Sequence, residues 1–187
     1  MKDPRKTFMD AGALKEGHFL LASGKHSGYY FQAQSALQHP SVARETGKAL
    51  AEFWKNEEIE TVVSLAVGGV LLGHETAKAL ETRHIFAERK KGEMGFHRGF
   101  SVRPGERVLI VEDVITTGGS VREVIGKLES SGADIKGIAA LLKRGKAEFK
   151  HPLRALMEAE WEAYDPSGCP LCLKRLPLST PGTKQFS

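Results

Sequence analysis

The run from Val108 to Ser120, VLIVEDVITTGGS, limits the fold of this chain more than any other stretch. Its four leading aliphatic residues do not alternate with polar ones, which predicts a strand that is buried on both faces of a parallel sheet. Two carboxylates, Glu112 and Asp113, come next, and a Thr/Gly/Ser loop then leads into a helical pattern. The run therefore predicts a strand–loop–helix unit of an α/β domain.

The loop of this run is suited to binding phosphate. Backbone N–H groups of Thr116 to Ser120 would stand at a helix N-terminus, where free donors and the helix dipole favour an anion. Glu112 and Asp113 would repel phosphate, but they can accept hydrogen bonds from vicinal hydroxyls, each worth about 1.5–3 kcal/mol. These groups predict a sugar-phosphate site. Because Ser120 and Glu123 also match an S-x-x-E capping box, a capped helix without a ligand is the alternative.

Strand and helix patterns alternate along the rest of the chain, so we expect an α/β fold with a mostly parallel twisted sheet flanked by helices. Ligands of such sheets bind beyond the carboxyl ends of the strands, where four polar or glycine-containing loops would meet. We expect one domain over 1–187, with a loosely ordered tail over 173–187. Strands are expected over 17–22, 28–32, 61–67, 83–88, 108–112, 135–142 and 154–161, and helices over 5–14, from 41, over about 69–80 and over 120–131.

Composition and charge argue against several classes of protein. Hydrophobic residues make up 41% and charged residues 27% of the chain, which is ordinary for a globular domain. No apolar run approaches the roughly 20 residues that span a bilayer, and no apolar segment follows the basic N-terminus. We therefore expect a cytoplasmic protein without a membrane partner. The net charge of +4 is modest and no nucleic-acid motif is present, so we expect no nucleic-acid partner.

The two cysteines, Cys169 and Cys172, form a single C-x-x-C pair. Such a pair supplies half of a tetrahedral zinc site. It does not begin a helix in a thioredoxin-like unit, so redox catalysis has little support. Two interpretations stay open, namely a pair of ordinary thiols in a C-terminal turn and a zinc ion that is shared across a dimer.

Val108 to Ser120 resembles the 5-phosphoribosyl-1-diphosphate (PRPP) motif of type I phosphoribosyltransferases, in which an aliphatic strand, two acidic residues and a phosphate loop follow one another. Residues 17–31, GHFLLASGKHSGYYF, resemble the N-terminal hood of orotate phosphoribosyltransferases, which here would cover residues 1 to about 38. The segments FAER at 86–89 and RGF at 98–100 and the CPLC pair resemble a bacterial branch of that family. The resemblance extends from about residue 8 to 176, and it implies transfer of a phosphoribosyl group from PRPP to orotate, giving orotidine 5-monophosphate and pyrophosphate.

The resemblance also implies roles for individual residues. Asp113 would act on the ribose and be the nearest protein carboxylate to a Mg²⁺ ion that is held largely by PRPP and water. PRPP would be bound by Gly68, Gly69, Glu112, Asp113, Val114, Ile115, Thr116, Thr117, Gly118, Gly119 and Ser120. Orotate would be bound by Thr116, Arg144, His26, Tyr30 and Phe31. A mobile catalytic loop, closing over the site of a homodimer, would supply Arg89, Lys90, Lys91, His97 and Arg98.

The chain departs from the better-known pattern of the family at three places. His26 and Gly68 stand where lysines are common, and the mobile loop is shorter than usual. Two other functions remain as alternatives, a phosphoribosyltransferase for a purine or another base, and a PRPP-sensing regulator without catalysis. Arg144 argues against a purine, because a purine carries no carboxylate for the guanidinium to bind.

Overall fold

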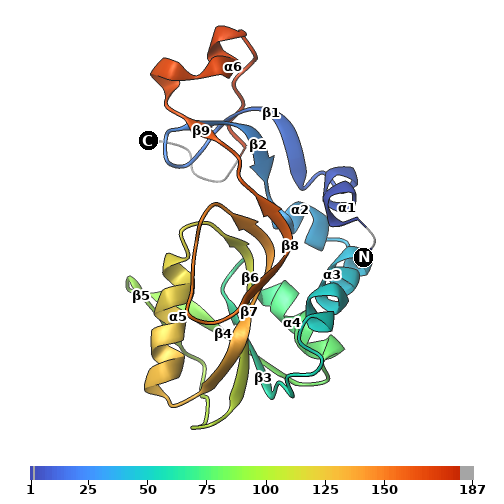
Figure 1. The fold of residues 1–187 in the computed structure, drawn as a ribbon, viewed down its shortest axis with the longest axis vertical. Coiled ribbons are helices and arrows are strands. Elements are labelled where there is room, and N and C mark those ends of the chain that lie inside the picture. The colour runs from blue at the N-terminus through green and yellow to red at the C-terminus, as the bar shows by residue number, and fades with distance from the viewer. Residues whose placement is uncertain (2, 182–187) are drawn as a thin grey trace.

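The computed structural model describes residue 1 and residues 3–181, and its main feature is a six-stranded sheet, which we call the large sheet (Figure 1). Five of its strands run parallel, and β5 pairs antiparallel with β4 at one edge. The predicted α/β fold is confirmed. In spatial order the strands are β5 (Glu93–Phe96), β4 (Arg83–Lys90), β3 (Thr61–Leu65), β6 (Arg107–Ile115), β7 (Asp134–Arg144) and β8 (Leu153–Ala159).

Helices cover both faces of the large sheet. Helices α3 (Pro40–Glu52) and α4 (Val70–Ala79) lie on one face, and α5 (Gly119–Ser130) lies on the other (Figure 1). Each face has its own apolar cluster, and Val108 to Val111 of β6 are fully buried between the two clusters. The aliphatic run of the motif thus occupies the centre of the fold, because burying it removes apolar surface from water on both sides.

A second, antiparallel sheet lies above the carboxyl ends of the large sheet in Figure 1, and we call it the small sheet. Its order is β1-β2-β9, so the hairpin from the predicted hood pairs with a strand from the C-terminal part of the chain. The elements of this region are α1 (Pro4–Asp10), β1 (Leu14–Leu20), β2 (His26–Phe31), α2 (Ala33–Leu37), β9 (Ala163–Tyr164), the 3-10 turn Pro166–Gly168 and α6 (Pro170–Leu173).

The C-terminal part of the chain differs from the prediction in two ways. The strand expected over 154–161 is not the last, since β9 and α6 follow it. Residues 173–181 do not all form a loose tail, because Ser179 pairs with β1: its N–H donates to the His18 carbonyl at 2.8 Å and its carbonyl accepts from Leu20 N–H at 2.9 Å. Residues 182–187 of the predicted tail lie outside the described residues.

The segment expected to be a mobile loop is an antiparallel hairpin of β4 and β5. Its turn consists of Lys91 and Gly92, which both have positive φ angles of 50° and 88°. Two consecutive residues with positive φ form the tight turn that suits the twist of a hairpin. Met94 of β5 is 4% exposed and packs into the apolar cluster on the α5 side, which holds the second strand against the sheet.

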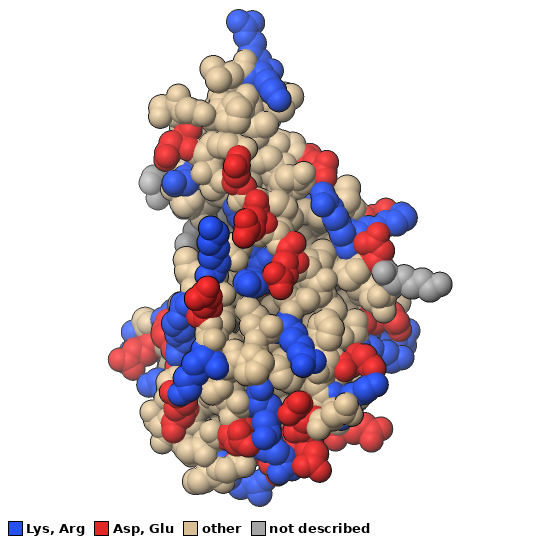
Figure 2. Space-filling model, in the orientation of Figure 1, with Lys and Arg blue, Asp and Glu red and all other residues tan. Residues whose placement is uncertain are grey.

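Charges of both signs are interspersed on the face of the molecule seen in Figure 2. This mixture fits the modest net charge of +4. Among the described residues, no helix is both long enough and apolar enough to cross a bilayer.

Candidate functional site

The Thr/Gly/Ser loop joins the end of β6 to the start of α5 and encloses a small polar pocket. Gly118 is the N-cap residue of α5 and adopts a left-handed conformation with φ of 77°. The backbone N–H groups of the first helical turn have no partners within the helix, so they are available to an anion. The pocket has a volume of about 270 Å³ and is lined by Glu112, Val114, Ile115, Thr116, Thr117, Gly118, Gly119, Ser120, Val121 and Glu123.

The predicted capping box is wrong. Helix α5 begins at Gly119, so Ser120 lies within the first turn and the N-cap residue is Gly118, without a side-chain cap. Glu123 instead forms a bidentate ion pair with Arg89 of β4, at 2.7 and 3.1 Å. Since Glu123 lines the phosphate-sized pocket, this pairing offsets a negative charge that would otherwise oppose an anion.

Arg122 holds the loop in place from the side. Its guanidinium donates to the Thr117 carbonyl at 2.6 Å and to the Glu148 carbonyl at 2.9 Å, and it lies over the Phe149 ring at 5.0 Å. A Cβ atom on Gly118 would approach Phe149 to 2.5 Å, so a side chain at Gly118 would be opposed by both its φ angle and its surroundings.

Glu112 and Asp113 lie in β6, which continues to Ile115, and their side chains differ in environment. Glu112 is 9% exposed. Burial, and then the adjacent Asp113 carboxylate, raise the pKa of Glu112 to about 9. Asp113 is more open and accepts a hydrogen bond from Gln34 Nε2 at 2.8 Å. Burial and the neighbouring carboxylate thus favour the protonated form of Glu112, and its Oε1 accepts a hydrogen bond from the Asp113 N–H at 3.0 Å.

Gly68 and Gly69 pack directly against these carboxyl groups. A Cβ atom on Gly68 would overlap the Asp113 carboxylate, and one on Gly69 would lie 3.1 Å from Glu112 Oε1. Gly69 is also the N-cap residue of α4. The structure thus brings both glycines together with the acidic pair, and the absence of side chains there leaves room for the two carboxyl groups.

The five basic residues predicted for the mobile loop separate into two groups. Arg89 and Arg98 are held in the hairpin region by bidentate ion pairs, Arg89 with Glu123 and Arg98 with Glu88. The others line a separate cavity beside the later turns of α5 and are not gathered around the phosphate-sized pocket in this conformation. Those residues are Lys90, Lys91 and His97, and they share the cavity with Lys127, Ser130 and Ser131.

Arg144 ends β7, one strand away from the acidic pair. Its guanidinium lies over the Trp161 ring at 5.8 Å, and Trp161 in turn stacks on Tyr29 of β2 at 5.2 Å. Burial lowers the pKa of Arg144 from its usual value. The side chain therefore lies at the boundary between the two sheets, partly removed from water, where pairing with an anion would be strengthened.

Three residues predicted to contact the base have other partners in the structure. His26 is 5% exposed, and its Nδ1 atom faces His18 Nε2 at 2.9 Å and Cys172 Sγ at 3.3 Å. Phe31 packs edge-on against Phe8 in the apolar core, and Tyr30 packs against Phe19 in the small sheet. His26 faces the interior of the small sheet, and Phe31 is only partly buried, so their assignment to the base site stays a prediction.

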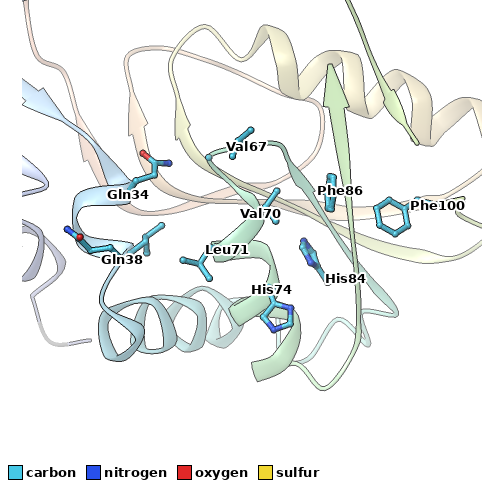
Figure 3. A pocket seen from close by; sticks show the side chains of 11 residues that line it. Gln34, Gln38, Val67, Val70, Leu71, His74, His84, Phe86 and Phe100 are labelled. Carbon is cyan, nitrogen blue, oxygen red and sulfur yellow. The ribbon is translucent and has the colours of Figure 1, made fainter. Parts of the chain in front are cut away.

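A larger, mostly apolar cavity of about 720 Å³ lies next to the glycine loop (Figure 3). Gln34 and Gln38 approach it from one side and Phe86 and Phe100 from the other (Figure 3). Its rim includes Val67, which is 89% exposed although the end of an aliphatic strand pattern predicts a buried side chain there.

Gln34 and Arg122 were both missed by sequence reasoning. Gln34 reaches Asp113 from a helix 79 residues earlier, and no spacing rule connects two such positions. Arg122 had a weak signal, because it follows the phosphate loop within the first helical turn, where a long basic side chain can fold back on the loop.

Comparison with known proteins adds to this geometry. The family described as "Phosphoribosyl transferase domain" matches residues 33–158. Orotate phosphoribosyltransferase of Desulforamulus reducens is 45% identical over 96% of this chain and 95% of its own length, and the Thermotoga maritima protein of the same name is 45% identical over 92% and 94%. The crystal structure of orotate phosphoribosyltransferase from Aeropyrum pernix superposes with a TM-score of 0.68 at 22% identity, covering 83% of this chain and 93% of that one.

Proposed function

This chain belongs to the phosphoribosyl transferase family, and we propose that it transfers the 5-phosphoribosyl group of PRPP to N1 of orotate. The products would be orotidine 5-monophosphate and pyrophosphate, which places the enzyme in pyrimidine nucleotide biosynthesis. One observation carries the proposal: Glu112, in the acidic pair near the end of β6, lines the phosphate-sized pocket at the start of α5, with Asp113 next to it in the strand. Orotate as the acceptor is supported by the names of relatives that match nearly the whole chain.

The 5-phosphate would occupy the pocket formed by Thr116 to Ser120. Its oxygens would accept hydrogen bonds from the loop N–H groups and from the Thr and Ser hydroxyls. Arg122 would keep the loop in this shape through the Thr117 carbonyl, so that the donors are oriented before the ligand arrives.

The ribose hydroxyls would lie over Glu112 and Asp113. The Asp113 carboxylate would accept a hydrogen bond, and protonated Glu112 would donate one, so the pair can bind two hydroxyls without two adjacent charges. Breaking the bond from C1 to pyrophosphate leaves positive charge on the ribose ring, and the Asp113 carboxylate would stabilise that charge. Gln34 would hold Asp113 in position for this role.

Arg144 would bind the carboxylate of orotate. A guanidinium matches a carboxylate with two parallel hydrogen bonds, and partial burial strengthens the pairing. Trp161 would limit the rotation of Arg144 and give the base a flat apolar neighbour. The order of the two sheets supports this placement, since Arg144 stands between the β6 site and the small sheet.

Mg²⁺ fits the same edge of the large sheet. Carboxylate oxygen is a ligand that Mg²⁺ prefers, and Asp113 is the more open of the two acidic side chains. When bound with PRPP, the ion would neutralise the charge of the departing pyrophosphate. Asp113 would hold it only in part, with the ligand and water supplying the other oxygens.

Two further parts of the proposal concern assembly and the basic hairpin. A second copy of the chain would cover the apolar cavity beside Val67, whose exposure supports a homodimer.

Lys90, Lys91 and His97 would reach pyrophosphate only after the hairpin moves, or from the second copy. A cytoplasmic location stays a prediction.

The direct test follows the ultraviolet absorbance of orotate with purified protein, PRPP and Mg²⁺. We expect the orotate absorbance to fall only when all three are added, and orotidine 5-monophosphate and pyrophosphate to appear in equal amounts. Unchanged orotate together with calorimetric binding of PRPP would contradict orotate as the acceptor, and adenine, hypoxanthine, guanine and uracil would then be tried in its place.

A further inference from the structure

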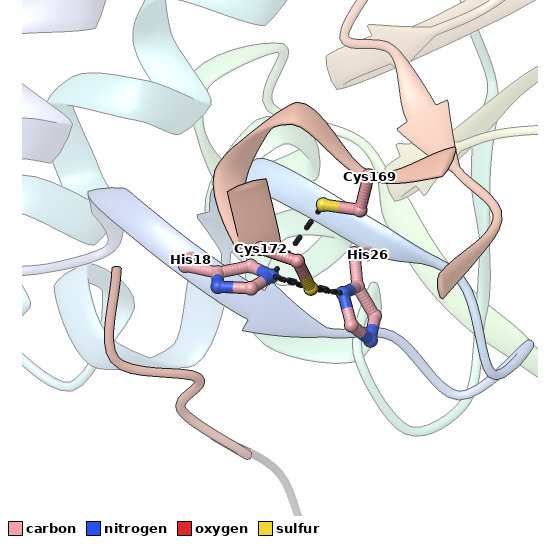
Figure 4. A group of neighbouring side chains, drawn as sticks. All are labelled: His18, His26, Cys169 and Cys172. Atoms are coloured by element: carbon pink, nitrogen blue, oxygen red, sulfur yellow. Dashed lines mark hydrogen bonds between the residues drawn. The ribbon is translucent and has the colours of Figure 1, made fainter. Parts of the chain in front are cut away.

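Four potential metal ligands from distant parts of the chain meet beside the small sheet. His18 comes from β1, His26 from β2, and Cys169 and Cys172 from the start of α6 (Figure 4). One ligand atom of each residue lies within 4.8 Å of the ligand atoms of the other three. His18, His26 and Cys169 are 3%, 5% and 1% exposed, and Cys172 lies on the open side of the group.

Three of the four printed separations between these atoms fall within the range of a tetrahedral metal site, and the fourth, between the two histidine nitrogens, is shorter. His18 Nε2 lies 2.9 Å from His26 Nδ1, 3.6 Å from Cys169 Sγ and 3.8 Å from Cys172 Sγ, and Cys172 Sγ lies 3.3 Å from His26 Nδ1. Zinc bound to sulfur at about 2.3 Å and to nitrogen at about 2.0–2.1 Å would place tetrahedral ligands roughly 3.3–3.8 Å apart. We propose that these four side chains form a structural Cys2His2 zinc site within a single chain.

The hydrogen bond on the far side of His18 supports this assignment. His18 Nδ1 lies 2.9 Å from the Leu176 carbonyl, which can only accept, so Nδ1 carries the ring proton and Nε2 presents its lone pair to the cluster. Zinc-bound histidines usually donate their second nitrogen to a carbonyl or a carboxylate in this way. The lone pair of His18 Nε2 faces three other ligand atoms, from His26, Cys169 and Cys172. One metal ion at the centre of the group would account for this arrangement.

The zinc site would stabilise the attachment of the C-terminal segment to the small sheet. Helix α6 has no buried residue, and β9 is two residues long, so little apolar packing holds the C-terminal segment to the β1–β2 hairpin. A zinc ion would join the hairpin to a segment about 150 residues later, as it does in small domains that lack an adequate core. The cysteine pair would therefore be structural, with its two histidine partners in the same chain and no need of a dimer.

The first test measures the zinc content of the full-length protein, purified without chelators, by inductively coupled plasma mass spectrometry. We expect about one zinc per chain. Cys172→Ser and His18→Ala should each lose most of this metal, while His39→Ala should keep it, because His39 is exposed and outside the cluster. Wild-type protein without zinc, or Cys172→Ser with full zinc, would overturn the proposal.

A second measurement does not depend on how well the variants fold. Wild-type protein stripped of metal and titrated with Co²⁺ should show the strong visible bands of a tetrahedral thiolate-bound ion, and Zn²⁺ should abolish them. A weak octahedral spectrum would contradict the site. Mass spectrometry without reductant that found a Cys169–Cys172 disulfide in the protein as purified would also contradict it.

Discussion

The large and small sheets are stabilised in different ways. The large sheet encloses two apolar clusters, and the central residues Val108 to Val111 are fully buried. The β1–β2 hairpin shares one of these clusters through Leu14, Tyr29 and Phe31, whereas α6 has no buried residue and the C-terminal segment meets the hairpin at a polar cluster of two histidines and two cysteines. The proposed ligands lie where the two sheets meet. In the proposed function, the large sheet positions the sugar phosphate, and Arg144, at the boundary with the small sheet, meets the base.

The largest effect is expected from Asp113→Asn, which keeps the shape of the side chain and removes its charge. If the end of β6 carries the chemistry, kcat/KM should fall by about 100-fold or more, since a charge facing the transition state is lost. Steady-state kinetics would measure the effect. Asp134→Asn, at the opposite end of the parallel strands, is the matched control and should keep normal turnover. Equal turnover of both variants would remove Asp113 from the mechanism.

Gly137→Ala in β7 tests how closely the apolar core packs against the large sheet. A Cβ atom there would overlap the buried Trp54 ring and lie 2.9 Å from the Pro152 carbonyl. Overpacking of this kind should lower the free energy of unfolding by about 1–3 kcal/mol, measured by urea denaturation.

Gly126→Ala is the matched control for this substitution. No atom lies within 4 Å of its added Cβ in the middle of α5, so the variant should gain about 0.5–1 kcal/mol. Equal free energies of unfolding for Gly137→Ala and Gly126→Ala would contradict the close packing of Trp54 against β7.

Arg144→Ala tests the boundary between the two sheets. Losing charge-assisted hydrogen bonds to a carboxylate should raise the KM for orotate about 10- to 100-fold and change the KM for PRPP little. Arg154→Ala is the control, because Arg154 also lies over a tryptophan ring but near the start of β8. Equal increases in both KM values for Arg144→Ala would contradict the assignment to orotate.

The smallest effect concerns His84, a half-buried histidine near the edge of the large sheet. Burial, and then nearby His74, lower its pKa to about 4, and its Nε2 lies 2.8 Å from Ser64 Oγ. Since the unfolded chain takes up the proton near pH 6.5, stability is complete above that pH and is lost as the pH falls towards 4.

Between pH 7.5 and pH 5, the wild-type protein should therefore lose about 1–2 kcal/mol more unfolding free energy than His84→Gln. Urea denaturation of both proteins at the two pH values isolates this difference, because other groups titrate alike in both. An identical loss in the two proteins would show that His84 is not held neutral.

The two regions also differ in how far the sequence predicts them. The motif strand, its loop and its helix are contiguous from Val108 to Ser130, so local patterns predicted their order and burial. The hairpin after β4 was missed because its charged residues resemble a solvated loop. The two-residue turn Lys91–Gly92 was the available signal.

The polar cluster of the small sheet could not be predicted in the same way. Cys169 and Cys172 pointed to half of a metal site, but the histidines that meet them lie about 150 residues earlier. His26 was assigned to the base site because the hood resemblance placed it there. The pairing of β2 with β9 and of Ser179 with β1 brings the C-terminal segment beside His26, which no local pattern predicts. Gln34 and Asp113 are a second example of a contact that depends on the whole fold.

Hydrogen exchange followed by mass spectrometry, with and without chelation of zinc, tests this contrast most directly. Metal removal should abolish protection in peptides covering 18–27 and 163–176 and leave protection over 107–144 unchanged, because the large sheet has apolar clusters on both faces. Equal protection in both samples, or a loss spread evenly over both sheets, would contradict the conclusion that the two regions are held together by different means.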